Sequence, residues 1–214
     1  MNNLPNNNKK HSPAYLQSYE ILRDKILNGD LPSGTKIVEE KVAEELGMSR
    51  TPVRESIKKL ENEGLIVKKK VVSPTEADLR NMFQVRILLE GYSAKCAATY
   101  LPEDKLSSLW ECVENGRKEN IDEIMKANEL FHEIIVNASN NRVMIDIIDK
   151  MSSIIYLFRR TVVYYNRPFL IDEHEEIYNA IKERDGQKAE RLMQQHLQTD
   201  LDFWLHLINN NKGN

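Results

Sequence analysis

Two sets of side chains in the sequence combine residue types and spacings that could do chemistry. The first is the segment SRTPVRE, residues 49–55, in which Arg50 and Arg54 stand four residues apart just after a glycine-containing turn. The second is a set of three histidines, each within an apolar segment: His132, His174 and His196. Arginine side chains can pair with guanine edges, whereas converging imidazoles can bind first-row divalent cations. Each set needs elements that position it.

The first set lies on a predicted helix that runs to about Glu63, with Ser49 placed to cap its N-terminus. At about 100° per residue, one face of this helix gathers cationic and hydroxyl side chains, namely Arg50, Thr51, Arg54 and Lys58. The opposite face gathers the apolar Val53, Ile57 and Leu60. The apolar face must pack on the two preceding predicted helices, and the free N–H groups at the helix start suit phosphate. The pattern predicts a helix-turn-helix for DNA, with a merely solvated basic face as the alternative.

The three histidines project from apolar stripes of separate predicted helices toward a shared interior. Because a buried imidazole needs a hydrogen-bond partner or a metal, three converging rings plus one oxygen ligand could hold Zn or Ni. From periodicity alone, three separate core histidines bonded to carbonyl groups are the simpler interpretation. Arg86, in phase with apolar residues, could pair with a ligand carboxylate or with Glu90 one turn later. Arg159 and Arg160 follow an apolar run and could line the cavity, but a solvated face is the favoured interpretation.

The chain divides near Ser73–Pro74 into a mixed N-terminal part and an entirely helical remainder. We predict a DNA-binding domain over residues 14–73 and a six-helix bundle over 74–208, with a disordered arm at 1–13 and a disordered tail at 209–214. Helical periodicity and breaking residues place the six helices at 75–99, 103–118, 121–138, 141–164, 168–184 and 186–208. Thr75 and Asp78 form a predicted capping box at the start of the first.

The composition is that of a globular protein, and the net charge differs slightly between the N-terminal part and the rest of the chain. The net charge is −3, yet residues 9–73 hold 13 lysines and arginines against 10 acidic residues. A polyanion would therefore meet the N-terminal part. No apolar run is long enough to span a bilayer and the N-terminus lacks a signal-peptide core, so we expect a cytoplasmic protein without membrane contact. Cys96 and Cys112 are read as reduced thiols.

The segment GTKIVEEKVAEELGMSRTPVRESIKKLENEGLI, residues 34–66, resembles the winged helix-turn-helix of the GntR family of bacterial transcriptional regulators. The resemblance implies that the residues matching Ser49, Arg50, Thr51 and Arg54 contact the operator. The family often has a basic residue where this chain has Glu40, and Lys41 beside it could substitute. The family's wing is longer and carries glycine, so VKKKVVSPT predicts a truncated β wing. Its lysines would contact phosphates, unless they only line a solvated strand edge: Lys68, Lys69 and Lys70.

Three later segments resemble the FCD effector domain of the family's FadR branch, in its six-helix VanR-like subgroup. They are residues 86–101, 127–141 and 172–197, and the last is the most specific. The resemblance implies a metal held by an Asp and three histidines, beside which a small carboxylate effector binds. The histidines carry over as His132, His174 and His196, but the Asp position is Asn128. An amide oxygen brings no charge, so metal affinity should be lower than with a carboxylate.

Together these features predict a mainly α-helical, non-enzymatic regulator that binds a pseudo-palindromic double-stranded DNA operator as a homodimer. We expect a repressor, with DNA affinity controlled by a small organic acid, a divalent metal or both. One alternative keeps DNA binding but makes the helical part a dimerisation module with a degenerate site. The other is a three-histidine metallohydrolase, but Glu129, Glu133 and Glu173 should point away from the ligands that they neighbour in sequence.

Overall fold

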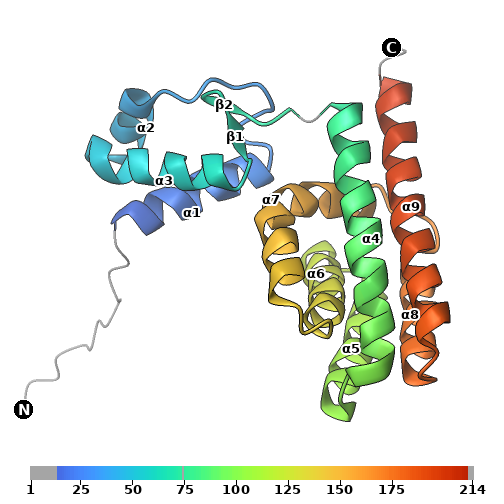
Figure 1. The fold of residues 1–214 in the computed structure, drawn as a ribbon. Coiled ribbons are helices and arrows are strands. Elements are labelled where there is room, and N and C mark those ends of the chain that lie inside the picture. The colour runs from blue at the N-terminus through green and yellow to red at the C-terminus, as the bar shows by residue number, and fades with distance from the viewer. Residues whose placement is uncertain (1–13, 74, 212–214) are drawn as a thin grey trace, which may run out of the picture. The chain divides into compact units, whose positions relative to one another are not determined.

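The computed structural model describes residues 14–73 and 75–211, which form two compact units divided between Ser73 and Pro74. The described chain is mainly α-helical, and its only sheet in these ranges has two short strands, which confirms the predicted fold class. Among these residues, no helix combines the length and apolar character needed to cross a membrane. Figure 1 shows the helices and strands of each unit.

The first unit contains helices α1 (Ala14–Leu27), α2 (Glu39–Leu46) and α3 (Arg50–Asn62), followed by strands β1 (Ile66–Val67) and β2 (Lys70–Val71). Its core is formed by apolar side chains that α1 and α3 bury, among them Leu22, Ile26, Val53 and Leu60. Helices α1 and α3 also meet through Ser18 and Ser56, whose buried hydroxyls are hydrogen-bonded at 2.8 Å. The small size of serine lets two helices approach closely while each hydroxyl keeps a partner.

The turn between α2 and α3 has the expected geometry. Gly47 has φ 62° and ends α2 in the left-handed conformation that glycine adopts without strain. Ser49 is the N-cap residue of α3, but its side chain makes no capping hydrogen bond. The hydroxyl of Ser49 is thus left to face solvent at the start of α3.

The wing is a minimal hairpin, as the short sequence predicted. Its strands pair antiparallel, with Ile66 opposite Val71 and Val67 opposite Lys70. Lys68 and Lys69 form the two-residue turn with φ 51° and 59°, and Lys36 forms an isolated bridge with Lys70. Two consecutive left-handed residues are the signature of a type I′ turn, which favours Asn-Gly over lysine.

The second unit contains six helices: α4 (Glu76–Tyr100), α5 (Glu103–Gly116), α6 (Ile121–Asn137), α7 (Arg142–Tyr164), α8 (Leu170–Lys182) and α9 (Gly186–Asn211). The two longest, α4 and α9, run antiparallel side by side (Figure 1). Thr75 and Asp78 form the predicted capping box at the start of α4. The core is filled by side chains from these helices, including Phe83, Phe131, Ile177 and Met193.

Helix α9 corrects the predicted tail, because it continues through Asn211 rather than ending at 208. Asparagine lowers helix propensity only modestly, and neither proline nor glycine occurs between Gly186 and Gly213. The predicted arm, residues 1–13, and residues 212–214 lie outside the described residues.

Candidate DNA-reading face and candidate metal centre

The candidate DNA-reading face lies on α3, on the exposed side of the helix that carries the predicted DNA contacts. Its predicted DNA-contacting residues are all exposed, namely Ser49, Arg50, Thr51, Arg54 and Lys58. Val53, Ile57 and Leu60 are buried beneath them. The amphipathic division of α3 therefore fixes its orientation, and the N-terminus of the helix carries its hydroxyl and guanidinium groups outward.

Part of this face is hollowed into a groove of about 550 Å³ between α2, α3 and the wing. Its cationic lining residues are Lys36, Arg50, Arg54, Lys58 and Lys69. Lys41, Lys68 and Lys70 are exposed but do not line it. The structure thus gathers three of the predicted contacts on α3 with one wing lysine, and it adds Lys36, which no sequence pattern had indicated.

Glu40 places a carboxylate on this cationic surface. Its Oε1 lies 2.6 Å from Nη2 of Arg50, and both side chains are more than half exposed. An exposed ion pair of this kind contributes little to stability. The pair occupies one guanidinium nitrogen of Arg50, which is predicted to contact the operator.

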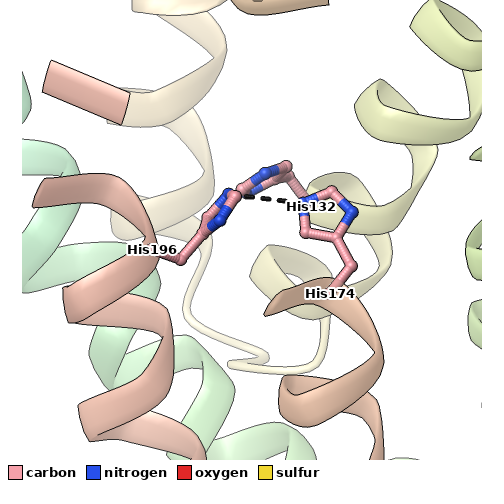
Figure 2. A group of neighbouring side chains, drawn as sticks. All are labelled: His132, His174 and His196. Atoms are coloured by element: carbon pink, nitrogen blue, oxygen red, sulfur yellow. Dashed lines mark hydrogen bonds between the residues drawn. The ribbon is translucent and has the colours of Figure 1, made fainter. Parts of the chain in front are cut away.

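The three histidines converge from different helices of the second unit: His132 from α6, His174 from α8 and His196 from α9 (Figure 2). All three are about 1% exposed. Each offers one ring nitrogen such that the three atoms lie within 4.8 Å of one another. The Nε2 atoms of His174 and His196 are 3.3 Å apart. The histidines are therefore one cluster, and the interpretation as three separate core histidines is wrong.

Two carboxylates orient the rings from behind. His132 Nδ1 lies 2.6 Å from Oε2 of Glu90, and His196 Nδ1 lies 2.8 Å from Oε2 of Glu173. An Nδ1–H that donates to a carboxylate leaves the Nε2 lone pair free, as in histidine ligands of metals. Glu173 was expected to point away from its sequence neighbour His174. It does not serve that ring, but the helix packing brings it to the ring of His196 on α9.

Asn128 lies one turn before His132 on α6 and is 2% exposed. Neither its amide oxygen nor its amide nitrogen has a hydrogen-bond partner among the described residues. A buried amide without partners is costly, about 1–3 kcal/mol for each unsatisfied group. One turn from His132 on the same helix, this amide is a candidate fourth ligand for an ion held by the histidines.

A second layer of charge surrounds the cluster. Arg86 is fully buried and its Nε donates to Glu90 at 2.7 Å, while its Nη1 and Nη2 have no hydrogen-bond partner in the described chain. Arg159, expected on a solvated face, is instead 8% exposed and its Nε is also without a partner. On the far side, Arg167 forms ion pairs with Glu173 at 2.6 Å and with Asp200 at 2.7 Å.

Burial and these contacts shift the pKa values of the titratable groups in and around the histidine cluster. Burial lowers the pKa of His132 to about 3 against the opposing effect of Glu90, and burial with the neighbouring histidines holds the pKa of His174 well below its ordinary value. Burial alone would raise the pKa of Glu90, but Arg86 and His132 hold it below its usual range. Burial and Arg86 lower the pKa of Arg159 to about 10. His132 and His174 are therefore neutral imidazoles near pH 7, and the Glu90 carboxylate beside His132 is ionised.

Sequence reasoning missed Glu90 as a partner of His132, and it also missed Glu173, Arg167 and Asp200. Periodicity could have placed Glu90 on the buried face of its helix, one turn after Arg86. No sequence signal could have paired Glu173 with His196, because that contact depends on how α8 packs on α9.

A helix-turn-helix unit with a small wing, followed by an all-helical unit enclosing a polar cluster, defines a two-part transcriptional regulator. Residues 14–73 match the family described as bacterial regulatory proteins, gntR family, and residues 81–199 match the FCD domain. The chain therefore belongs to the GntR family of transcriptional regulators and carries an FCD domain. Its relatives are regulators, not enzymes.

The chain is 28% identical to the uncharacterized HTH-type transcriptional regulator YdhC of Bacillus subtilis, over 96% of this chain and 97% of the relative. It is 32% identical to the gluconate operon transcriptional repressor of the same species, over 82% and 78% of the two chains. Its fold is similar to that of E. coli McbR/YncC, with a TM-score of 0.73, 21% identity, and 92% and 99% of the chains covered. That last likeness concerns the fold alone.

Proposed function

We propose that this regulator is a repressor that binds a pseudo-palindromic operator as a homodimer, and that a divalent metal in the helical unit, with a small carboxylate effector, controls its DNA affinity. The observation that carries the proposal is the histidine cluster, in which one ring nitrogen of each histidine lies within 4.8 Å of the other two while carboxylates contact Nδ1 of His132 and His196. The repressor among the relatives supports the sign of regulation.

The donor set fits Zn²⁺ or Ni²⁺. Three imidazoles and one amide oxygen are available, from His132, His174, His196 and Asn128. In a tetrahedral zinc site with bonds near 2.0–2.1 Å, two ligand atoms are about 3.3 Å apart, which is the distance between Nε2 of His174 and His196. When bound, the ion would supply a Lewis-acidic position for an oxygen ligand. With no ligand carboxylate, the centre would keep its full charge of +2 and so attract an anion.

The arginines beside the cluster support an acidic effector. Arg86 and Arg159 are buried with unpartnered guanidinium nitrogens, and burial together with the charge of Arg86 lowers the pKa of Arg159. A carboxylate could accept hydrogen bonds from such groups and remove the repulsion between them. Arg86 therefore remains the proposed effector-binding residue, with Glu90 as the partner that holds its Nε.

The metal part of the proposal is tested by elemental analysis of untagged protein purified without chelator. We expect about one Zn or Ni per chain, and loss of that metal in His196→Ala. The matched control is His206→Ala, which removes an exposed histidine from the same helix and should keep the metal. A cluster without metal in the unaltered protein would leave the helical unit as a dimerisation module.

The DNA part is tested on Arg54 and Lys58, which line the same groove. If Arg54 holds a base edge, Arg54→Ala should reduce discrimination between operator and altered operators by about 1–3 kcal/mol. Lys58→Ala should weaken binding to all sequences alike and lower its salt dependence, because a lysine on phosphate carries no sequence information. Titrations of labelled DNA at several salt concentrations separate the two results. Equal weakening on all DNAs in Arg54→Ala would assign that arginine to phosphate.

A further inference from the structure

A small cavity of about 180 Å³ lies between α6 and α7 and reaches the histidine cluster at His132. Arg159 lines it as well, so the cavity contains both a proposed metal ligand and a buried cation. Binding pockets for drug-sized molecules are roughly 300–1,000 Å³. The cavity therefore selects a ligand of only a few non-hydrogen atoms.

The inner part of the cavity suits an anion. Arg159 is 8% exposed and its Nε has no hydrogen-bond partner in the described residues. Burial in apolar surroundings costs a charged guanidinium several kcal/mol unless a counter-charge is supplied. Glu90, Glu129 and Asp200 are the negative charges that act on Arg159, but Glu90 already serves Arg86 and His132, and Asp200 pairs with Arg167. A ligand carboxylate could accept a hydrogen bond from the unpartnered Nε of Arg159.

The lining nearer solvent has the opposite sign. Three carboxylates line the cavity, the half-buried Glu129 and the exposed Glu133 on α6, and the exposed Asp149 on α7. Among the described residues, none of the three forms an ion pair. Glu129 and Glu133 are one helical turn apart, so both face the same side of α6. A plain organic acid would have to pass and remain beside these negative groups.

A ligand with both charges satisfies both ends of the cavity. We propose that the effector is a small zwitterion, an amino acid, whose carboxylate meets Arg159 and the histidine centre while its ammonium group meets Glu129, Glu133 and Asp149. The inference rests on the proposed function, since it names the class of acid that the regulator senses. It adds the requirement for an ammonium group, which the arginines and histidines alone do not impose.

The test compares matched probes on the full chain with one equivalent of Zn²⁺. The twenty L-amino acids, small amino acids with distal amino groups, the corresponding 2-hydroxy acids and the amino acid amides are screened by thermal unfolding and then by calorimetry. We expect at least one amino acid to bind tenfold or more tightly than its hydroxy acid and its amide. The hydroxy acid lacks the ammonium group, and the amide lacks the carboxylate.

Variants locate the effect. The double variant Glu129→Gln/Glu133→Gln, or Asp149→Asn alone, should weaken the amino acid about tenfold and leave the hydroxy acid unchanged or tighter. Asp146→Asn is the control, because it removes an exposed carboxylate from α7 that does not line the cavity. A preference for the amino acid that survives these variants would overturn the inference.

Two other outcomes would also overturn it, and they differ in what they leave standing. If hydroxy acids bind as well as or better than amino acids, a plain acid is the effector and the proposed function stands. If neither class binds although Zn²⁺ does, the cavity has no small-acid ligand, and the effector part of the proposed function fails with the inference.

Discussion

At the scale of single residues, Glu90 connects the two chemistries of the helical unit. One oxygen of its carboxylate accepts from Arg86, and the other contacts Nδ1 of His132. The carboxylate thereby fixes the tautomer of a proposed metal ligand and neutralises a buried cation. Glu173 does the same for His196 and Arg167, but its side chain is 24% exposed. The two carboxylates therefore have the same role, and Glu90 is the more deeply buried of the two.

Their removal should weaken metal binding without removing a ligand. We expect Glu173→Gln to lower Zn²⁺ affinity about 10–100-fold, the usual effect of losing a carboxylate behind a histidine ligand. Competition with a chromophoric chelator measures it. Glu90→Gln should also lower Zn²⁺ affinity, but it leaves the charge of Arg86 buried without a counter-charge. The affinity of this variant is therefore compared only if circular dichroism shows a folded protein. Unchanged affinity in Glu173→Gln would mean that this carboxylate serves Arg167 alone.

The buried imidazoles also predict how stability depends on pH. With metal removed by chelation, His132 and His174 stay neutral in the folded state, because their pKa values are depressed by burial. In the unfolded chain they bind protons below about pH 6.5. The unfolded state then holds more protons, so the free energy of unfolding should fall as pH drops from about 6.5 toward 4, by up to about 1.4 kcal/mol per pH unit for each imidazole.

Urea unfolding at a series of pH values measures this slope. His132→Gln should reduce it, because one titrating group is gone, whereas the exposed His206→Gln should not. A free energy of unfolding that does not decrease between pH 6.5 and 5 would contradict neutral, buried imidazoles.

At the scale of elements, the wing combines an unfavourable backbone conformation with a proposed role in DNA binding. Lys68 and Lys69 occupy the two left-handed positions of the turn, although residues with side chains of this length are strained there. Lys69 also lines the cationic groove beside α3. Both lysines fit the turn poorly, and Lys69 adds positive charge to the groove that we propose meets DNA.

Replacing them should therefore separate stability from binding. We expect Lys68→Asn/Lys69→Gly to raise the free energy of unfolding by about 1 kcal/mol, because Asn-Gly suits a type I′ turn. The same change should weaken DNA binding and reduce the dependence of log affinity on log salt concentration, by about 0.9 for each lost phosphate contact. Thermal unfolding and DNA titration measure the two effects. Unchanged DNA affinity would leave these lysines as solvated turn residues.

The bounds of the helices show which parts of the fold could be predicted from the sequence. Period 3.6 and the breaking residues placed all six helices of the second unit, each within a few residues of its observed bounds, because those signals are local. Gly47 and the Thr75–Asp78 box were likewise readable from residue type. Contacts between helices could not be predicted from such local signals. The pairing of Glu173 with His196 and the burial of Arg159 depend on tertiary packing, which no spacing within one helix encodes.

At the scale of the whole molecule, regulation needs an element whose state both units can sense. Helix α4 begins two residues after the chain divides at Ser73–Pro74, and it carries Arg86 and Glu90 of the proposed effector site. A change at the site can therefore reach the DNA-binding unit through one continuous helix and its first turn. In that turn, the side chain of Thr75 accepts from the backbone N–H of Asp78, and Asp78 bonds back to Thr75.

Loosening this turn should reduce the coupling more than the binding of either ligand. Coupling of about 1–3 kcal/mol corresponds to a 5–150-fold change in operator affinity between metal-free and metal-loaded protein. We expect Thr75→Ala, which costs about 0.5–2 kcal/mol of local helix stability, to bring this ratio toward one. Titration of labelled operator with and without Zn²⁺ gives the ratio directly.

The matched control is Asn120→Ala, which removes the N-cap side chain of α6, a helix that does not adjoin the division of the chain. It should cost a similar amount of stability and keep the ratio. An equal loss in both variants would show that general destabilisation, and not the first turn of α4, changes the response. A ratio preserved in Thr75→Ala would mean that the signal leaves the helical unit by another route, with dimer geometry rather than the linker helix as the two-state element.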